Sequence, residues 1–334
     1  MGATGTEAAA PARPVRRPRF SVRTLAERWT LVIAFVGAFA FFAAARPNTF
    51  LTWDNVRAIL DDSSVLCVLA VGVTSVLVLG EFDLSVGFVV GMTAAAGVSV
   101  MAFHGWPAWA AVVVAIAAGA VAGTANGLSV AFVRIPSFIA TLALGSIAGA
   151  IELAITKTSI FQGLDPGYEQ IALTRVGTIP LRAIIAAGVM LVFLVVFRTT
   201  VYGRHASSVG DNPAAARLAG VPVARVTVIA FVLSGLTAGL AAVLVTSSAG
   251  SYYPNLGTGY LLPAYAAAFL GLSLTGGVRF TVLGSYLGVL LLDMVTTGLT
   301  MMNQPSWVAA LVQGVVLLVA VAGVAVRRRG ALGR

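Results

Sequence analysis

The chain has 334 residues, of which 59% are hydrophobic and only 10% charged, with a mean hydropathy of +0.96 and a net charge of +9. A soluble domain of this size could not cover its surface with so few charges, which excludes a soluble enzyme or binding module. The single cysteine, Cys67, lies in an apolar run, and the two histidines, His104 and His205, are far apart in the sequence. Neither a disulfide nor a metal site is therefore predicted.

Apolar segments recur along the whole chain, and each membrane-spanning helix needs about 20 residues. We predict an all-α, polytopic membrane protein with about ten spans, at residues 29–45, 63–80, 85–103, 108–131, 137–156, 181–198, 225–247, 262–275, 281–301 and 307–326. The eighth span is interrupted by Gly276 and Gly277. Reading the first span as a cleavable signal peptide, with a cleavage site near Ala43–Ala45, is the alternative to a retained first helix.

The basic residues are distributed unevenly between the two sides of such a protein. If both termini are cytoplasmic, sixteen of the 21 Lys and Arg residues lie in cytoplasmic segments, as the positive-inside rule requires. We therefore expect a basic cytoplasmic tail at 1–27, a transmembrane domain at 28–326 in contact with membrane lipids, and a second basic tail at 327–334. The arginines form no folded basic domain, so no nucleic-acid partner is expected.

A helix break follows the second predicted span, in the sequence GEFDLSVG at residues 80–87. Gly80 is expected to end one helix, and Asp83 to precede the next as a cap that accepts the N–H of Ser85 or Val86. Broken helices at membrane depth also face pathways, so a role of Asp83 in a pathway stays open. Glu81 adds a second carboxylate, which we expect to face Arg279 or another cytoplasmic arginine such as Arg204.

Two further polar clusters interrupt the apolar pattern. Asn126 lies near the end of the fourth span, and Ser137 and Thr141 form a polar stripe one turn apart on the fifth. The outer loop at residues 251–260 carries tyrosines beside Asn255, which suits either an interfacial aromatic belt or a sugar-binding rim. The belt is the favoured interpretation for Tyr252 and Tyr253. Asp293 is the deepest acid, either a polar packing residue or a pathway carboxylate.

A hydrophilic loop at residues 199–224 contains arginines, a turn and the sequence AAARLAG, which predicts a short helix. A helical polar insertion between two apolar spans suggests a docking surface for a soluble partner. The chain itself has no G-x-x-x-x-G-K-[ST] motif, and its only lysine is Lys157, so it cannot be a P-loop ATPase. No catalytic constellation and no cofactor is predicted.

Four segments, taken in order over about residues 50 to 325, resemble the permease subunits of ribose-type ABC importers, in the branched-chain amino acid and ribose permease superfamily. GEFDLSVG is similar to the family's G-G-x-D-L-S-V-G. Asn126-Gly127 with RIPSFIATLAL, then YGRHASSVGDNPAAARLAGV, then the segment from PNLGTGYLL onward match its later motifs. Glu81 departs from a family glycine, and Leu262-Pro263 departs from the usual start of the eighth span, which puts the substrate in doubt.

The resemblance implies two inverted repeats, spans 2–5 and 7–10, in a type II importer-like permease of a bacterial plasma membrane. It implies three partners: a cytoplasmic ABC ATPase that uses ATP, an extracytoplasmic sugar-binding protein, and a second permease in a homodimer or pseudo-dimer. Expected pathway residues are Asp83, Ser85, Asn126, Ser137, Phe138, Thr141 and Asn255. Expected ATPase-coupling residues are Gly210, Asp211, Asn212, Ala215, Ala216, Arg217 and Gly220.

The function implied is transport of a monosaccharide or related small polyol. A permease of the same superfamily for branched-chain amino acids or nucleosides is the alternative within transport. A standalone secondary carrier or channel is the alternative from another class. Few carboxylates lie within the spans, which disfavours a carrier, and the docking-type loop disfavours a channel.

Overall fold

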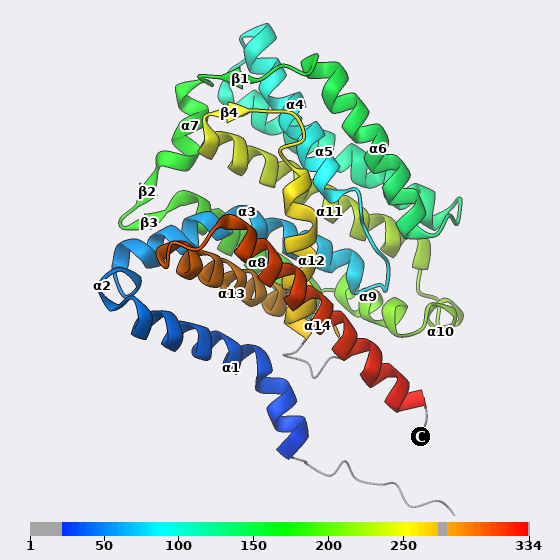
Figure 1. Cartoon of the computed structure of the whole chain (residues 1–334). Coiled ribbons are helices and arrows are strands. Elements are labelled where there is room, and N and C mark those ends of the chain that lie inside the picture. Colours follow the sequence, from blue (N-terminus) through cyan, green and yellow to red (C-terminus); the bar gives the residue numbers. More distant parts are fainter. Residues whose placement is uncertain (1–21, 273–278, 333–334) are drawn as a thin grey trace, which may run out of the picture.

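The computed structural model describes residues 22–272 and 279–332, which are almost entirely helical (Figure 1). The long helices are α1 (Val22–Ala45), α3 (Trp53–Leu77), α4 (Val86–His104), α5 (Ala108–Ala131), α6 (Ser137–Thr156), α8 (Leu181–Thr199), α11 (Val223–Ala249), α13 (Val282–Met301) and α14 (Ser306–Leu332). The shorter ones are α2 (Pro47–Phe50), α7 (Pro166–Leu173), α9 (Val201–Asp211), α10 (Pro213–Leu218), α12 (Leu261–Gly271) and the 3-10 helix η1 (Thr258–Tyr260). The predicted all-α class is confirmed.

Two short antiparallel pairs are the strands of the described residues. β1 (Phe161–Gln162) pairs with β4 (Ser251–Tyr252), and β2 (Arg175–Val176) pairs with β3 (Ile179–Pro180). The first pair joins the loop after α6 to the loop after α11, so it ties together two connections that are distant in the sequence.

Each predicted span coincides with one helix, and within residues 22–272 and 279–332 seven helices are long and apolar enough to cross a membrane. The second span differs most, because α3 begins at Trp53 instead of near residue 63. Thr52 caps the helix by accepting the N–H of Asn55 at 3.2 Å, and Asp54 pairs with Arg57 one turn later. These polar contacts stabilise the first turn of the helix.

The eighth predicted span, 262–275, corresponds to α12, which has 11 residues and ends at Gly271. The expected interruption at Gly276 and Gly277 lies outside the described residues. A helix of this length covers about half of a bilayer core at 1.5 Å per residue, so α12 is a half-span that begins after the outer loop.

The helix contacts are paired as two inverted repeats require. α3 packs on α13 as α11 packs on α5, and α3 and α11 also contact each other. Within one half α4 packs against α5 and α6, and within the other α12 packs against α13 and α14. The matching of α3–α6 with α11–α14 agrees with the repeats expected for spans 2–5 and 7–10.

Glycines bring α5 and α11 into backbone contact. A Cβ placed on Gly235 would lie 2.1 Å from the carbonyl oxygen of Gly119, and one on Gly239 would lie 2.5 Å from the carbonyl oxygen of Ala115. In lipid, where apolar surfaces do not drive helices together, such close approach increases the dispersion contacts that hold them.

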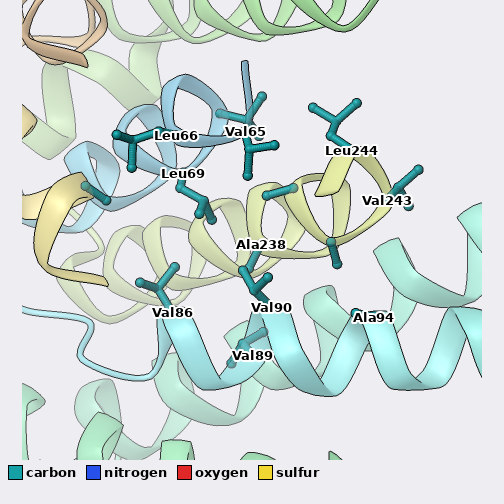
Figure 2. Close-up of a cluster of buried hydrophobic side chains, with 14 of the residues drawn as sticks. Val65, Leu66, Leu69, Val86, Val89, Val90, Ala94, Ala238, Val243 and Leu244 are labelled. Atoms are coloured by element: carbon teal, nitrogen blue, oxygen red, sulfur yellow. The ribbon is translucent and has the colours of Figure 1, made fainter. Parts of the chain in front are cut away.

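The largest apolar core lies where α3, α4 and α11 meet. Figure 2 shows side chains of all three helices converging, among them Leu69 from α3, Val90 from α4 and Ala238 from α11. These three residues are fully buried or nearly so. The core therefore fixes α4 against both α3 and α11, directly beside the chain break that precedes Val86.

We expect Gly235→Ala to destabilise the protein, since the added methyl group would force the backbones of α5 and α11 apart. Alanine is favoured over glycine in a helix by about 1 kcal/mol, so a loss of stability must come from this contact. The measurement is the midpoint of thermal unfolding in detergent. Gly188→Ala on α8, where a Cβ meets nothing within 4 Å, is the control and should leave the midpoint unchanged or higher. Equal midpoints for the two variants would contradict the contact.

Candidate functional site

The chain unwinds between α3 and α4, at residues 78–85. Gly80 adopts a left-handed conformation with φ of 82°. The N–H of Glu81 returns to the carbonyl of Val76 at 3.3 Å, which closes the last turn of α3 as a left-handed C-terminal cap does. The expectation that glycine ends this helix is confirmed.

Four consecutive backbone N–H groups of the break, those of residues 82–85, are each accepted by a side-chain oxygen. Phe82 donates to Ser137 Oγ at 3.1 Å and Leu84 to Thr141 Oγ1 at 3.0 Å, both on the first turns of α6. Asp83 donates to the hydroxyl of Tyr265 on α12 at 2.8 Å. Ser85 donates to Asp83 Oδ1 at 3.1 Å. Side chains from three elements therefore supply the partners that a helix would supply itself.

The carboxylate of Asp83 is 2% exposed and accepts from neutral donors. Oδ1 also receives the hydroxyl of Ser85 at 2.5 Å, and Oδ2 receives the hydroxyl of Ser234 on α11 at 2.7 Å. The expected bond to the N–H of Ser85 is present, but the residue that directly precedes α4 is Ser85 rather than Asp83. Asp83 thus both closes a local turn and holds α11, which is more than a cap exposed to the cytoplasm would do.

Asn126 extends this cluster onto α5. Its Nδ2 donates to Ser85 Oγ at 2.7 Å, and the residue is 1% exposed. Its Oδ1 is buried without a hydrogen-bond partner among the described residues. Five of the predicted pathway residues therefore meet here, and we call this group the break cluster: Asp83, Ser85, Asn126, Ser137 and Thr141, together with Ser234 and Tyr265.

Two predicted pathway residues do not join the break cluster. Phe138 is 53% exposed and lies on the outer surface of α6. Asn255 lies in the second chain break, between α11 and α12, where its N–H donates to Glu152 Oε1 at 2.7 Å. Phe138 directly follows Ser137 in α6, so its side chain is rotated by about 100° around the helix axis. Ser137 and Phe138 therefore cannot both face the break.

Glu152 anchors this outer break. It is fully buried on α6, and Oε1 also accepts the hydroxyl of Tyr252 at 2.9 Å. Burial raises the pKa of Tyr252, and the nearby carboxylate adds to this effect, so the phenol stays a donor. Tyr252 is itself fully buried, and the interpretation of Tyr252 as part of an interfacial belt is wrong. Tyr253, 49% exposed, remains compatible with it.

The hydrophilic loop folds into α9 and α10, and the predicted short helix is α10. Asn212 caps α10 by accepting the N–H groups of Ala214 and Ala215 at 3.1 and 3.0 Å, and Gly220 follows the helix with φ of 83°. Ala216 is buried, whereas Ala215, Arg217 and Leu218 are exposed. Leu218, with 92% exposure, is an apolar side chain that the sequence analysis did not single out.

Asp211 and Gly210, at the end of α9, connect the loop to the rest of the protein. Asp211 pairs with Arg279, just before α13, a partner that the sequence analysis did not name, and the hypothesis that Glu81 faces Arg279 stays a prediction. Arg204 donates to the carbonyl of Thr199. A Cβ on Gly210 would lie 1.9 Å from the carbonyl oxygen of Val78. Gly210 is therefore placed directly against the break after α3.

Charged side chains also occur in the N-terminal half of α3. Asp61 pairs with Arg182, which is 6% exposed at the start of α8. Asp293 on α13 has a buried Oδ2 without a hydrogen-bond partner among the described residues. No group of His, Cys, Asp and Glu within residues 22–272 and 279–332 is arranged to hold a metal ion, and Cys67 is buried.

A broken helix whose backbone is held by buried polar side chains, inside a bundle of inverted repeats, is typical of membrane transport proteins. The chain belongs to the family of permease components of branched-chain amino acid transport systems, whose sequence pattern matches residues 55–321. The predicted relationship to ribose-type importer permeases is thereby confirmed. Members of this family are transport permeases, and the chain is a multi-pass membrane protein.

Three relatives illustrate the range of the similarity. The ribose import permease of Escherichia coli (strain K12) is 32% identical over 91% of this chain and 95% of that protein. The autoinducer 2 import system permease of Enterobacter sp. (strain 638) is 35% identical over 86% of this chain and 83% of its own length. The L-arabinose ABC transporter permease of Azospirillum brasilense is 34% identical over 91% and 89%.

Substitution of Asp83 separates its structural bonds from its charge. Asp83→Asn retains an acceptor for Ser85 and gains a donor for Ser234, so we expect a thermal midpoint close to that of the wild type. Asp83→Ala leaves the N–H of Ser85 and the hydroxyl of Ser234 without their acceptor, at about 1–3 kcal/mol for each buried group. Thermal unfolding in detergent measures both. A midpoint for Asp83→Asn as low as that for Asp83→Ala would show that the negative charge itself stabilises the fold.

Proposed function

We propose that this chain forms the transmembrane pathway of an ABC importer for a monosaccharide or a related small polyol. The observation that carries the proposal is the break cluster, which places hydroxyl and amide groups from four helices and from the break itself at an unwound part of the bundle. Relatives that import ribose, autoinducer 2 and L-arabinose support this substrate class. Hydroxyl and amide side chains suit a polyhydroxylated ligand because both can donate and accept.

A separate cytoplasmic ATPase would supply the energy, and α9 with α10 would be its docking surface. Arg217 and Leu218 are both exposed at the end of α10, and arginine is enriched among the residues that contribute most to protein interfaces. Asn212 and Gly220 fix the two ends of α10, so the surface is rigid before docking. The chain would use no cofactor of its own, since ATP would bind to the partner.

Both termini and the α9–α10 loop would lie in the cytoplasm, by the positive-inside rule. The outer loops would then receive an extracytoplasmic sugar-binding protein, and the pathway would be completed by a second permease in a homodimer or pseudo-dimer. Transport would follow alternating access around the break cluster, driven by movement of the docked ATPases.

Two other functions make different predictions. A permease of the same superfamily for branched-chain amino acids or nucleosides would have a binding protein that retains those ligands instead of a sugar. A standalone carrier or channel would move its substrate in vesicles that contain this chain alone. Uptake that depends on both the ATPase and a sugar-loaded binding protein distinguishes the proposed function from both.

The docking surface can be tested by binding. We expect Leu218→Asp and Arg217→Glu to weaken binding of the importer's ATPase subunit by at least about tenfold, because interface centres contribute about 2 kcal/mol or more. The assay measures ATPase binding to the permease in lipid nanodiscs. Arg225→Glu, the same charge change at an exposed arginine on the first turn of α11, is the control. Undiminished binding of both α10 variants would refute this surface.

The orientation can be tested by thiol labelling in a Cys67→Ser background. Ser208 on α9 and Thr258 at the start of η1 are both exposed. We expect Ser208→Cys to react with an impermeant maleimide only from the cytoplasmic side of oriented vesicles, and Thr258→Cys only from the outside. Labelling of Ser208→Cys from the outside would reverse the proposed topology.

A further inference from the structure

One continuous stretch of chain contacts both α9, beside the proposed ATPase-docking surface, and the outer loop. We define the relay segment as residues 78–91, which comprise the break and the first turns of α4. We infer that the relay segment transmits movement of α9 and α10 to the outer loop at residues 251–260, so that the two ends of the pathway move together. This inference rests on the proposed function for its direction, from the ATPase outward, but the mechanical link itself is independent of any partner.

The first contact of the relay segment is with α9. Val209 on α9 is 3% exposed and packs in one buried cluster with Val76 and Leu79, at the end of α3 and in the break. Beside it, Gly210 meets the carbonyl of Val78 so closely that a Cβ would lie 1.9 Å from the oxygen. Contacts between backbones have no flexible side chain between them, so α9 cannot shift without moving residues 78 and 79.

The middle of the relay segment has no helical hydrogen bonds of its own to resist such a shift. Residues 82–85 are held by four side-chain oxygens, three of them on α6 and α12. A displacement of α9 would therefore alter all four of these hydrogen bonds together. The bond from the N–H of Asp83 to Tyr265 already connects the break to α12, the half-span that follows the outer loop.

The last contact is between Gly87, on the first turn of α4, and Gly257, in the chain break between α11 and α12. A Cβ on Gly257 would lie 2.2 Å from the carbonyl oxygen of Gly87 and 2.7 Å from the N of Gly91, and one on Gly87 would lie 3.0 Å from the carbonyl oxygen of Gly257. The first turn of α4 thus touches the backbone of the outer loop. Glu152 fixes the same loop by accepting the N–H of Asn255, so movement of α4 must reach residues 255–257.

Hydrogen–deuterium exchange of the full-length permease in nanodiscs tests the link without an ATPase or a sugar. Val209→Ala removes methyl groups from the buried contact between α9 and the break. We expect it to raise amide exchange at least about twofold in residues 78–85 and also in residues 251–260. Segments that pack on one another open together, so weakening one contact raises exchange throughout the group. Val201→Ala makes the same change on the same helix at a residue that is 56% exposed, and should leave both regions unchanged.

The reciprocal perturbation starts from the outer loop. Gly257→Ala should raise exchange in residues 78–85 and at the end of α9, whereas Gly259→Ala, where a Cβ meets nothing within 4 Å, should not. If Gly257→Ala does not fold, the response of residues 251–260 to Val209→Ala decides alone. An effect of Val209→Ala confined to α9 and residues 78–80 would overturn the relay. Loss of ATPase binding in the Leu218 experiment bears on the proposed function only, so the two can fail separately.

Discussion

Backbone that unwinds between two membrane-spanning helices must find hydrogen-bond partners within the protein, because lipid offers none. Residues 82–85 meet this constraint with one side-chain oxygen for each N–H group. Each unmet group would cost about 1–3 kcal/mol, a large share of the stability of a typical fold. The positions of α6 and α12 relative to α4 are therefore set by the need to supply these oxygens.

The same constraint explains why the two repeats are held together differently. α5 and α11 meet through glycines, which allow their backbones to touch, whereas α3 and α13 meet through a hydroxyl pair, Thr74 Oγ1 and Ser285 Oγ at 2.6 Å. Small residues permit a close, apolar contact, and hydroxyls add a hydrogen bond between the helices.

The sequence predicted the helices well because ten apolar segments separated by polar turns have few other solutions in a membrane. It also predicted five members of the break cluster, since motifs place Asp83 and Ser85, Asn126, and Ser137 and Thr141 at helix ends, where polar residues stand out. Ser234 and Tyr265 were missed because each lies between small or apolar residues inside an apolar helix, where an average of hydropathy does not single it out.

Errors in the sequence analysis have physical causes of the same kind. Tyr252 was assigned to the surface because aromatic residues near a loop favour the interface, yet its burial depends on Glu152, a hundred residues earlier in the chain. Asp211 was not named as a partner of Arg279 because Glu81 and Asp211 are both carboxylates in polar segments, and charge alone does not distinguish them. Contacts over such separations depend on how helices pack, and that is fixed by glycine contacts whose pairing no spacing in the sequence reveals.

The two chain breaks are held by buried carboxylates with neutral partners, Asp83 at one and Glu152 at the other. Among the described residues, neither carboxylate takes part in an ion pair of the kind that joins Asp61 to Arg182. Hydrogen bonds to a charged group contribute about 1.5–3 kcal/mol each, whereas breaking one partner of a buried ion pair costs about 3–5 kcal/mol. A bound partner shifts an equilibrium between two conformations only by the difference in its affinity for them, and each tenfold difference corresponds to about 1.4 kcal/mol. Exchanging single hydrogen bonds at a break therefore needs a smaller difference in affinity than separating a buried ion pair would.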